Sequence, residues 1–216
     1  MMRMLLLGTE FSTLFVVFPL LIYKRWIPNL PIPYLLAGGV AVFFVLRREA
    51  TFPASQFINW DGARAWVWPV LKRDAVLLAL LGAAVWLFAR EKLFSLVKAR
   101  PGLWMAIMLL YPLVSVYPQE LLYRGFFFHR YAGLFGSGWG MILASAAAFG
   151  FVHIIFRNWL AVGMCLAGGL LFSWTYQQSG SLALVCVEHA LFGSFLFTAG
   201  LGEFFYHGAA LRRGRK

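Results

Sequence analysis

Three separated positions place groups that could activate a water molecule inside a strongly apolar chain. The stretch YPQELLYRGFFFHR, residues 117–130, carries Glu120 and, one helical turn later, Arg124. His153 and His189 follow, each in an apolar run of its own. A carboxylate and two imidazoles on three helices of one bundle can take a proton from water, orient the water and stabilise an oxyanion. The same trio, Glu120, His153 and His189, could instead hold a divalent metal such as zinc.

Each of these residues also has a structural interpretation. Ionisable groups in a membrane span are costly unless they are paired or face water. Glu120 and Arg124 share one helical face, so they could form an ion pair that locks two helices together. A single histidine on an apolar helix is usually a hydrogen-bonded packing residue. The occurrence of all three groups in one chain favours the functional interpretation.

Composition indicates the elements that must position these groups. The chain has 216 residues, of which 62% are hydrophobic and 12% charged, and its mean hydropathy is +0.76. A soluble domain carries about twice that charge. No Asp, Glu, Lys or Arg occurs within residues 26–46, 101–119, 131–156 or 158–187. Such runs match the length of membrane-spanning helices and lack the alternation of a β-barrel, so we predict an all-α, polytopic membrane helix bundle of about seven or eight transmembrane helices.

The boundaries of the apolar runs predict eight spans. We expect them at residues 4–23, 29–46, 74–90, 101–117, 118–134, 138–156, 158–177 and 181–202. Pro118 lacks an amide proton, so a helix is expected to restart or kink there. The aromatic-rich segment between the second and third spans is expected to lie in the membrane interface. Gly163, Gly168 and Gly169 favour close helix contact.

A single transmembrane domain, residues 1–216, is the predicted organisation. Residues 1–100 would form supporting spans, residues 101–202 the core that carries the motifs, and residues 203–216 a basic tail. The first span is expected to be retained, because Glu10 interrupts its apolar stretch and no small-residue cleavage site follows. We predict an integral, multi-pass protein of a bacterial inner (cytoplasmic) membrane.

The net charge of +11 indicates contact with lipid rather than with nucleic acid. The basic residues cluster at the ends of apolar runs, where phospholipid head groups would meet them. The sequence carries no RNA- or DNA-binding motif. Cys165 and Cys186 lie in apolar runs without metal-ligand spacing, so packing explains both. Glu10 and Glu188 are expected to be paired or to reach the interface, and Glu188 should point away from the neighbouring His189.

Three short motifs resemble those of one known family. They read Gln119-Glu120-Leu-Leu-Tyr-Arg124, Phe149-Gly-Phe-Val-His153 and His189-Ala-Leu-Phe-Gly193. In type and order they resemble the Glu-Glu-x-x-x-Arg, Phe-x-x-x-His and His-x-x-x-Asn/Asp motifs of the CAAX protease and bacteriocin-processing (CPBP, or Abi) family. These proteins are intramembrane proteases and include the prenyl-protein CAAX endopeptidase. The resemblance covers roughly residues 112 to 200.

Two departures from the family pattern leave two interpretations. Gln119 stands where the family has the glutamate taken as general base, and Gly193 stands where it has an Asn or Asp that helps to stabilise the oxyanion. In the first interpretation Glu120 acts as base with His153, Gln119 and His189 donate hydrogen bonds to the oxyanion, and Arg124 holds Glu120. In the second, the bundle has lost hydrolysis and binds membrane segments as a scaffold. We favour the first, because Glu120, His153 and His189 are all present.

The resemblance also limits which cofactor and which substrates are expected. Family members have been described as metalloproteases and as glutamate-dependent enzymes without metal. Because no further ligand accompanies the trio, we favour no metal, with a divalent ion such as zinc as the alternative. The expected partners are the lipid bilayer and a membrane protein or peptide substrate, such as a prenylated C-terminus, a leader peptide or a C-terminal membrane anchor. A transporter is disfavoured, since the sequence shows no internal repeat.

Overall fold

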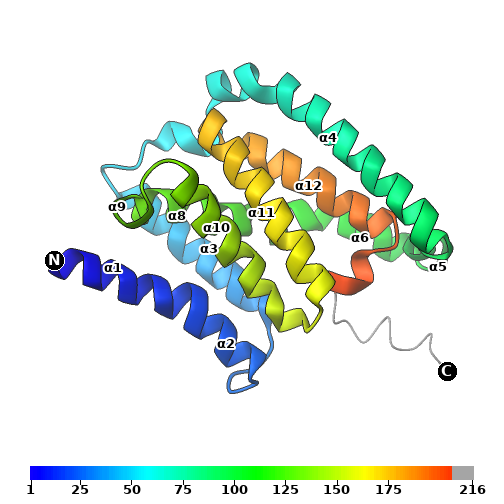
Figure 1. Cartoon of the computed structure of the whole chain (residues 1–216), viewed down its shortest axis with the longest axis horizontal. Coiled ribbons are helices and arrows are strands. Elements are labelled where there is room, and N and C mark those ends of the chain that lie inside the picture. Colours follow the sequence, from blue (N-terminus) through cyan, green and yellow to red (C-terminus); the bar gives the residue numbers. More distant parts are fainter. Residues whose placement is uncertain (206–216) are drawn as a thin grey trace.

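The structure is a computed structural model that describes residues 1–205 (Figure 1). Within these residues every regular element is a helix, which confirms the all-α prediction. The α-helices are α1 (Met2–Ser12), α2 (Phe18–Tyr23), α3 (Pro31–Arg48), α4 (Trp60–Ala89), α5 (Ser95–Ala99), α6 (Pro101–Tyr111), α7 (Tyr117–Glu120), α8 (Phe127–Arg130), α9 (Ala132–Phe135), α10 (Trp139–Val152), α11 (Trp159–Ser179) and α12 (Leu182–Thr198). Three π-helical turns, η1 (Thr13–Val17), η4 (Pro112–Val116) and η5 (Leu121–Phe126), continue α-helices, and 3-10 turns form η2 (Ala54–Ile58), η3 (Arg90–Lys92), η6 (His153–Phe156) and η7 (Gly202–Phe205).

Most of the long helices can cross a bilayer. Five in the described part of the chain are long and apolar enough: Met2–Tyr23, Pro31–Arg48, Pro101–Arg130, Trp139–Phe156 and Trp159–Ser179. The helix α12 is apolar but shorter, and α4 has 30 residues with charges in its first half. Counting α4 and α12, the residues described here supply seven candidate spans, in agreement with the predicted seven or eight.

The fourth and fifth predicted spans form one helix. The chain is helical from Pro101 to Arg130 without a break, so the predicted restart at Pro118 is wrong, and the alternative of a kink there stays a prediction. The helix reaches Glu120 through the π-helical η4 and leaves it through the π-helical η5. A proline removes one helical hydrogen bond and crowds the preceding turn, and the wider π turns accommodate both effects. Pro112 and Pro118 therefore loosen the helix around the motif instead of ending it.

The helix α4 begins well before the predicted third span. Asn59 caps its first turn by accepting a hydrogen bond from the Gly62 amide at 3.1 Å, and its side chain also donates to the Ser179 carbonyl at 3.1 Å. The start of α4 is thereby tied to the end of α11. The charged pair Arg73 and Asp74 does not stop the helix, because the two side chains pair with each other and Arg73 also pairs with Glu188 of α12. Much of the segment expected at the interface is therefore the first half of α4.

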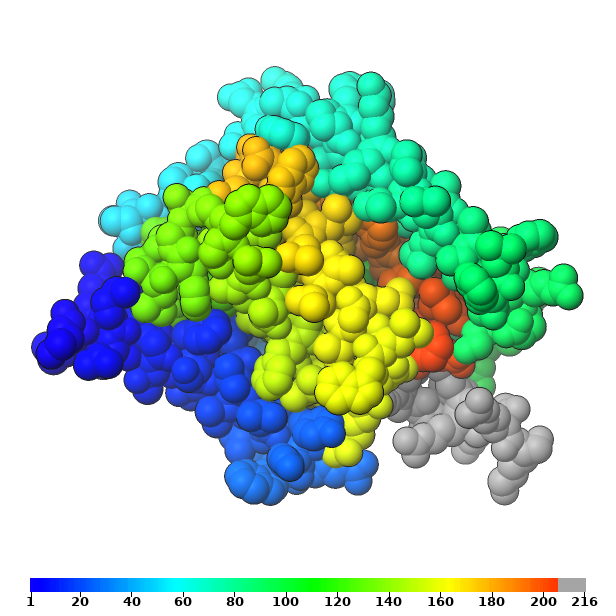
Figure 2. All heavy atoms as spheres, in the orientation of Figure 1, coloured from blue at the N-terminus to red at the C-terminus, as the bar shows by residue number. Residues whose placement is uncertain are grey.

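The helices α10 and α11 pack closely against each other and lie side by side on the face seen in Figure 2. A Cβ added at Gly169 would lie 2.9 Å from the Ala146 Cα, so the two backbones approach closely at this point. This confirms the helix contact predicted for Gly169. The close contact predicted for Gly163 is not present, because an added Cβ there would meet nothing within 4 Å.

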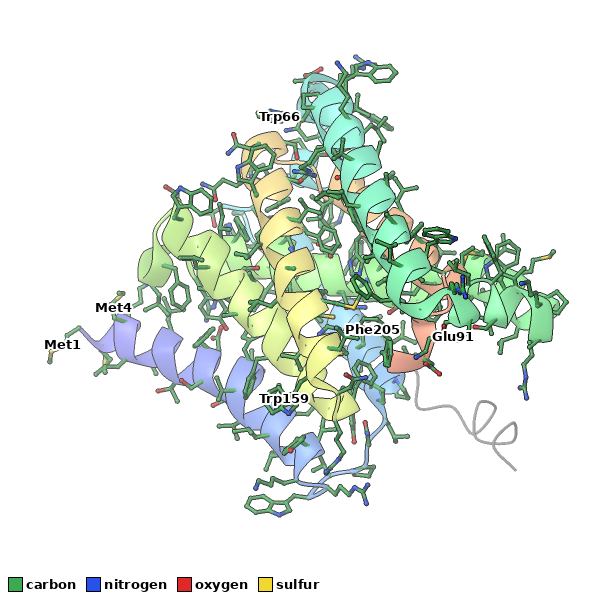
Figure 3. The ribbon with its side chains drawn as sticks, turned by 45° about the vertical axis from the view of Figure 1, so that its right-hand side comes forward. Met1, Met4, Trp66, Glu91, Trp159 and Phe205 are labelled. Carbon is green, nitrogen blue, oxygen red and sulfur yellow. The ribbon has the colours of Figure 1, made fainter. Side chains whose placement is uncertain are left out.

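The outer faces of the helices are apolar, as contact with lipid requires. Large exposed side chains include Leu80, Phe88, Leu109 and Leu113. Trp66 stacks edge-on against Trp174 near the end of α11, and Trp159 lies at its other end, as Figure 3 shows. Tryptophans at the two ends of a span are typical of membrane interfaces. The boundaries of the supporting and core regions stay a prediction, and residues 206–216 of the predicted basic tail lie outside the described residues.

Candidate functional site

Glu120 is held through one of its two carboxylate oxygens. Its Oε1 accepts a hydrogen bond from Arg124 Nη1 at 3.2 Å and lies 2.6 Å from Nδ1 of His189. The residue is 0% exposed, and its Oε2 has no hydrogen-bond partner among the described residues. The predicted Glu120–Arg124 pair is thus present, and it is joined by an imidazole from α12.

Arg124 is held by hydrogen bonds through both of its Nη atoms, whereas its Nε has no hydrogen-bond partner among the described residues. It is 0% exposed, and its Nη2 donates to the Gly169 carbonyl of α11 at 3.2 Å. Its guanidinium lies 4.7 Å from the ring centre of Phe149 and 5.5 Å from that of Phe172. Arginine stays charged in proteins, and a cation over an aromatic face is attracted to it. Arg124 therefore supplies a fixed positive charge beside Glu120.

The two histidines reach the site from different helices. His189 stacks on Phe172, with ring centres 4.6 Å apart and planes 19° apart. His153, at the end of α10, has its Nδ1 2.6 Å from the carbonyl oxygen of Phe149. The ring of Phe149 contacts both imidazoles, at 5.0 Å from His153 and 5.7 Å from His189. The structure thus joins His189 to Glu120 by a hydrogen bond and to His153 through the ring of Phe149, which contacts both imidazoles.

These contacts determine which ring nitrogen of each histidine carries a proton. A carbonyl oxygen and an ionised carboxylate can only accept, so Nδ1 of His153 donates to Phe149 and Nδ1 of His189 donates to Glu120. In the neutral imidazole the other nitrogen, Nε2, is then an acceptor. Both histidines therefore offer a lone pair to the site in their neutral forms.

The two positions that depart from the family pattern differ in their surroundings. Gln119 donates from Nε2 to the Ser115 carbonyl at 2.9 Å and to the Ser115 hydroxyl at 2.7 Å. An amide has two N–H groups, so the predicted donation of Gln119 to an oxyanion would require one of these bonds to break. At Gly193, an added Cβ would lie 2.5 Å from Cζ of Tyr111 and closer still to its hydroxyl. Tyr111 thus fills the space beside Gly193.

The arrangement does not form a metal site. Within residues 1–205 no three His, Cys, Asp or Glu side chains lie close enough together to hold a metal ion. The hydrogen bonds of His153 and His189 both use Nδ1 and leave a lone pair on Nε2, as in histidines that bind a metal. The absence of a metal cofactor therefore stays a prediction.

Two aromatic residues of the site were missed by the sequence analysis. Phe172 supports both His189 and Arg124, and Tyr111 packs edge-on to His189 with ring centres 6.1 Å apart. Neither belongs to one of the three motifs. The chain has 22 phenylalanines and 8 tyrosines, so residue type alone could not have singled them out.

Comparison with known proteins supports the resemblance found in the sequence. Residues 101–195 match the family model described as type II CAAX prenyl endopeptidase Rce1-like. The match runs from the start of α6 into α12 and includes every motif residue. The match agrees with the resemblance that the three motifs carry, and it covers less than half of the chain. No curated protein and no solved structure matches the chain.

Proposed function

We propose that this protein is an intramembrane endopeptidase that hydrolyses a peptide bond in a membrane-associated protein or peptide. The observation that carries the proposal is the bonding of Glu120, whose Oε1 is held by Arg124 and by the His189 imidazole while its buried Oε2 has no partner among the described residues. Leaving a buried polar atom unpaired costs about 1–3 kcal/mol. A water molecule bound at Oε2 would relieve this cost and would be positioned to react.

The reaction follows the chemistry of these groups. Glu120 Oε2 takes a proton from the water while the water oxygen attacks the peptide carbonyl carbon, and Nε2 of His153 accepts the second hydrogen of the water as a hydrogen bond. The negative charge moves to the carbonyl oxygen. Glu120 then returns its proton to the leaving nitrogen, and the C–N bond breaks to give a carboxylic acid and an amine. His189 and Arg124 hold the Glu120 carboxylate in place throughout.

The substrate must be partly unwound before it can react. A carbonyl in a helix is already hydrogen-bonded and shielded, and Glu120 lies inside the bundle. A peptide segment with an extended end in the membrane, such as a prenylated C-terminus, meets this requirement. The matched family model, described as a prenyl endopeptidase, supports this substrate class. We further propose a bacterial inner membrane as the location.

Reconstituted protein offers a direct test. The wild type and a Glu120→Gln variant are placed in lipid vesicles with a quenched fluorescent peptide that ends in a farnesylated CaaX sequence, and with an unprenylated transmembrane peptide. Cleavage of either peptide by the wild type and its loss in the variant is the expected result. Membrane proteomes of cells with the wild type or the variant provide an unbiased second measurement. Equal cleavage by a folded Glu120→Gln protein, or unchanged proteomes together with no cleavage of either peptide, would favour a binding scaffold instead.

A further inference from the structure

Few side-chain donors of the site are free to bind the developing negative charge. A tetrahedral intermediate is stabilised by hydrogen-bond donors directed at its oxyanion. Glu120 can only accept while it is ionised, and both neutral histidines present an acceptor nitrogen. Gln119 has both amide hydrogens on Ser115. Arg124 keeps an unpartnered N–H on its buried Nε, and its guanidinium is held over the rings of Phe149 and Phe172. Because an oxyanion site generally uses more than one donor, we expect a further group to contribute one.

Tyr111 is placed to provide one. Its ring lies edge-on to His189, at 6.1 Å between centres and 78° between planes, and its other aromatic neighbour is Phe197 at 5.5 Å. In residues 1–205 no hydrogen bond uses its hydroxyl. A phenol O–H is a donor at neutral pH, since its pKa is about 10 in the absence of perturbation. Tyr111 thus brings a free O–H beside the imidazole that is bonded to Glu120.

Gly193 makes this position available. An added Cβ there would lie 2.5 Å from Cζ of Tyr111 and closer to the hydroxyl, so any side chain at 193 would displace the end of the phenol ring. Real Cβ atoms do not approach other atoms so closely. The Tyr111 hydroxyl can therefore occupy this position only because residue 193 has no side chain.

We propose that the Tyr111 hydroxyl is an oxyanion donor of this site and that the lack of a side chain at Gly193 leaves room for it. The inference rests on the proposed peptidase function and adds a catalytic residue to it. The hydroxyl keeps its proton throughout. It donates a hydrogen bond to the carbonyl oxygen, and the bond strengthens as that oxygen gains charge. It therefore contributes to the transition state more than to substrate binding.

The first test removes a single oxygen atom. Tyr111→Phe keeps the ring contacts with His189 and Phe197, so folding should be preserved. With the farnesylated peptide in vesicles, kcat should fall about 10²–10³-fold, as is typical for loss of one oxyanion donor, with KM nearly unchanged. Inhibition by a matching peptide with a phosphinate in place of the scissile amide should weaken by a similar factor, because that group resembles the oxyanion. The control is Tyr117→Phe on the same helix. Tyr117 is 39% exposed and makes no contact with the described residues of the site, so this substitution should leave kcat unchanged.

A second test exchanges the two positions. In Tyr111→Ala combined with Gly193→Asn, the asparagine amide can enter the space that the ring has left and donate in place of the hydroxyl. The double variant should be at least tenfold faster than Tyr111→Ala alone. Gly193→Asn in the presence of Tyr111 should be inactive, because the two side chains collide.

The outcomes separate the two proposals. If Tyr111→Phe retains the wild-type kcat and phosphinate affinity while Glu120→Gln is inactive, Tyr111 is not the donor and the peptidase function stands. If Glu120→Gln cleaves as the wild type does, the function of Glu120 and the role of Tyr111 are both overturned. A double variant that is no faster than Tyr111→Ala would contradict the proposal that a donor at position 193 can replace the Tyr111 hydroxyl.

Discussion

Two buried ionic clusters begin from adjacent residues of α12 and differ in what surrounds them. The motif cluster consists of Glu120, Arg124 and His189, and the α4 cluster consists of Arg73, Asp74 and Glu188. Successive residues of a helix point about 100° apart, so Glu188 and His189 face different neighbours. This agrees with the prediction that Glu188 points away from the site.

The α4 cluster joins three helices. Arg73 is paired with Glu188 of α12, lies 3.1 Å from Asp74 Oδ1 and donates to the Thr175 hydroxyl of α11 at 3.0 Å. The Arg73 side chain is 25% exposed, whereas that of Arg124 is 0% exposed. No histidine or tyrosine is bonded to the α4 cluster in the described residues. An ion pair in a membrane span can therefore hold helices together or take part in catalysis. The additional polar groups in contact with the pair distinguish these two roles.

The largest difference should appear when each glutamate is neutralised. Glu120→Gln removes the proposed base, so peptide cleavage in vesicles should fall by about 10²–10⁴-fold. Glu188→Gln alters only the α4 cluster and should leave the rate close to wild type. The rates are measured at equal amounts of folded protein, determined by thermal unfolding in detergent. Equal losses in the two variants would remove the functional distinction between the clusters.

The two arginines should differ in their contribution to stability. Arg124→Ala leaves Glu120 buried without its cation, and breaking such a pair costs about 3–5 kcal/mol. Arg73→Ala should have a smaller effect, since water reaches the partly exposed Arg73 and the two remaining carboxyls can share a proton. Reversible unfolding in mixed micelles compares the two. A larger loss for Arg73→Ala would show that the α4 cluster carries more of the stability.

The helix contact beneath Arg124 can be tested with two glycines of α11. Gly169→Ala forces a methyl group against Ala146 and moves the carbonyl that accepts from Arg124, so stability should fall by about 1–3 kcal/mol and activity should fall with it. Gly163→Ala is the matched control, because its added methyl meets nothing within 4 Å. The same unfolding measurement serves for both variants. A neutral Gly169→Ala would mean that α10 and α11 can separate without cost.

The smallest effect is expected at Thr175. Thr175→Val keeps the shape of the side chain and removes one hydrogen bond to Arg73, which should lower stability by about 1 kcal/mol. Cleavage should be unchanged, because the α4 cluster does not enter the proposed reaction. A clear loss of activity without a loss of stability would connect the two clusters and contradict this separation.

Local patterns predicted much of this architecture. Span ends at 2–23, 31–48, 159–179 and 182–198 lie within a few residues of those expected from uncharged runs. The helix through Pro118 was not predicted, because proline chemistry describes one turn and does not reveal that π turns on both sides can absorb it. The early start of α4 was missed for a related reason. Charges at 72–74 indicate a span boundary unless their partners on α11 and α12 are known.

By itself, the sequence determined the all-helical membrane class and the order of the three motifs, because both follow from hydropathy and spacing along the chain. The sequence also predicted the ion pair between Glu120 and Arg124, since residues four apart on a helix are neighbours. Only the tertiary structure decided that His189 bonds to Glu120, that Phe149 contacts both imidazoles and that Tyr111 fills the space beside Gly193. These are contacts between helices, and they depend on rotation and separation that no local pattern in the chain specifies.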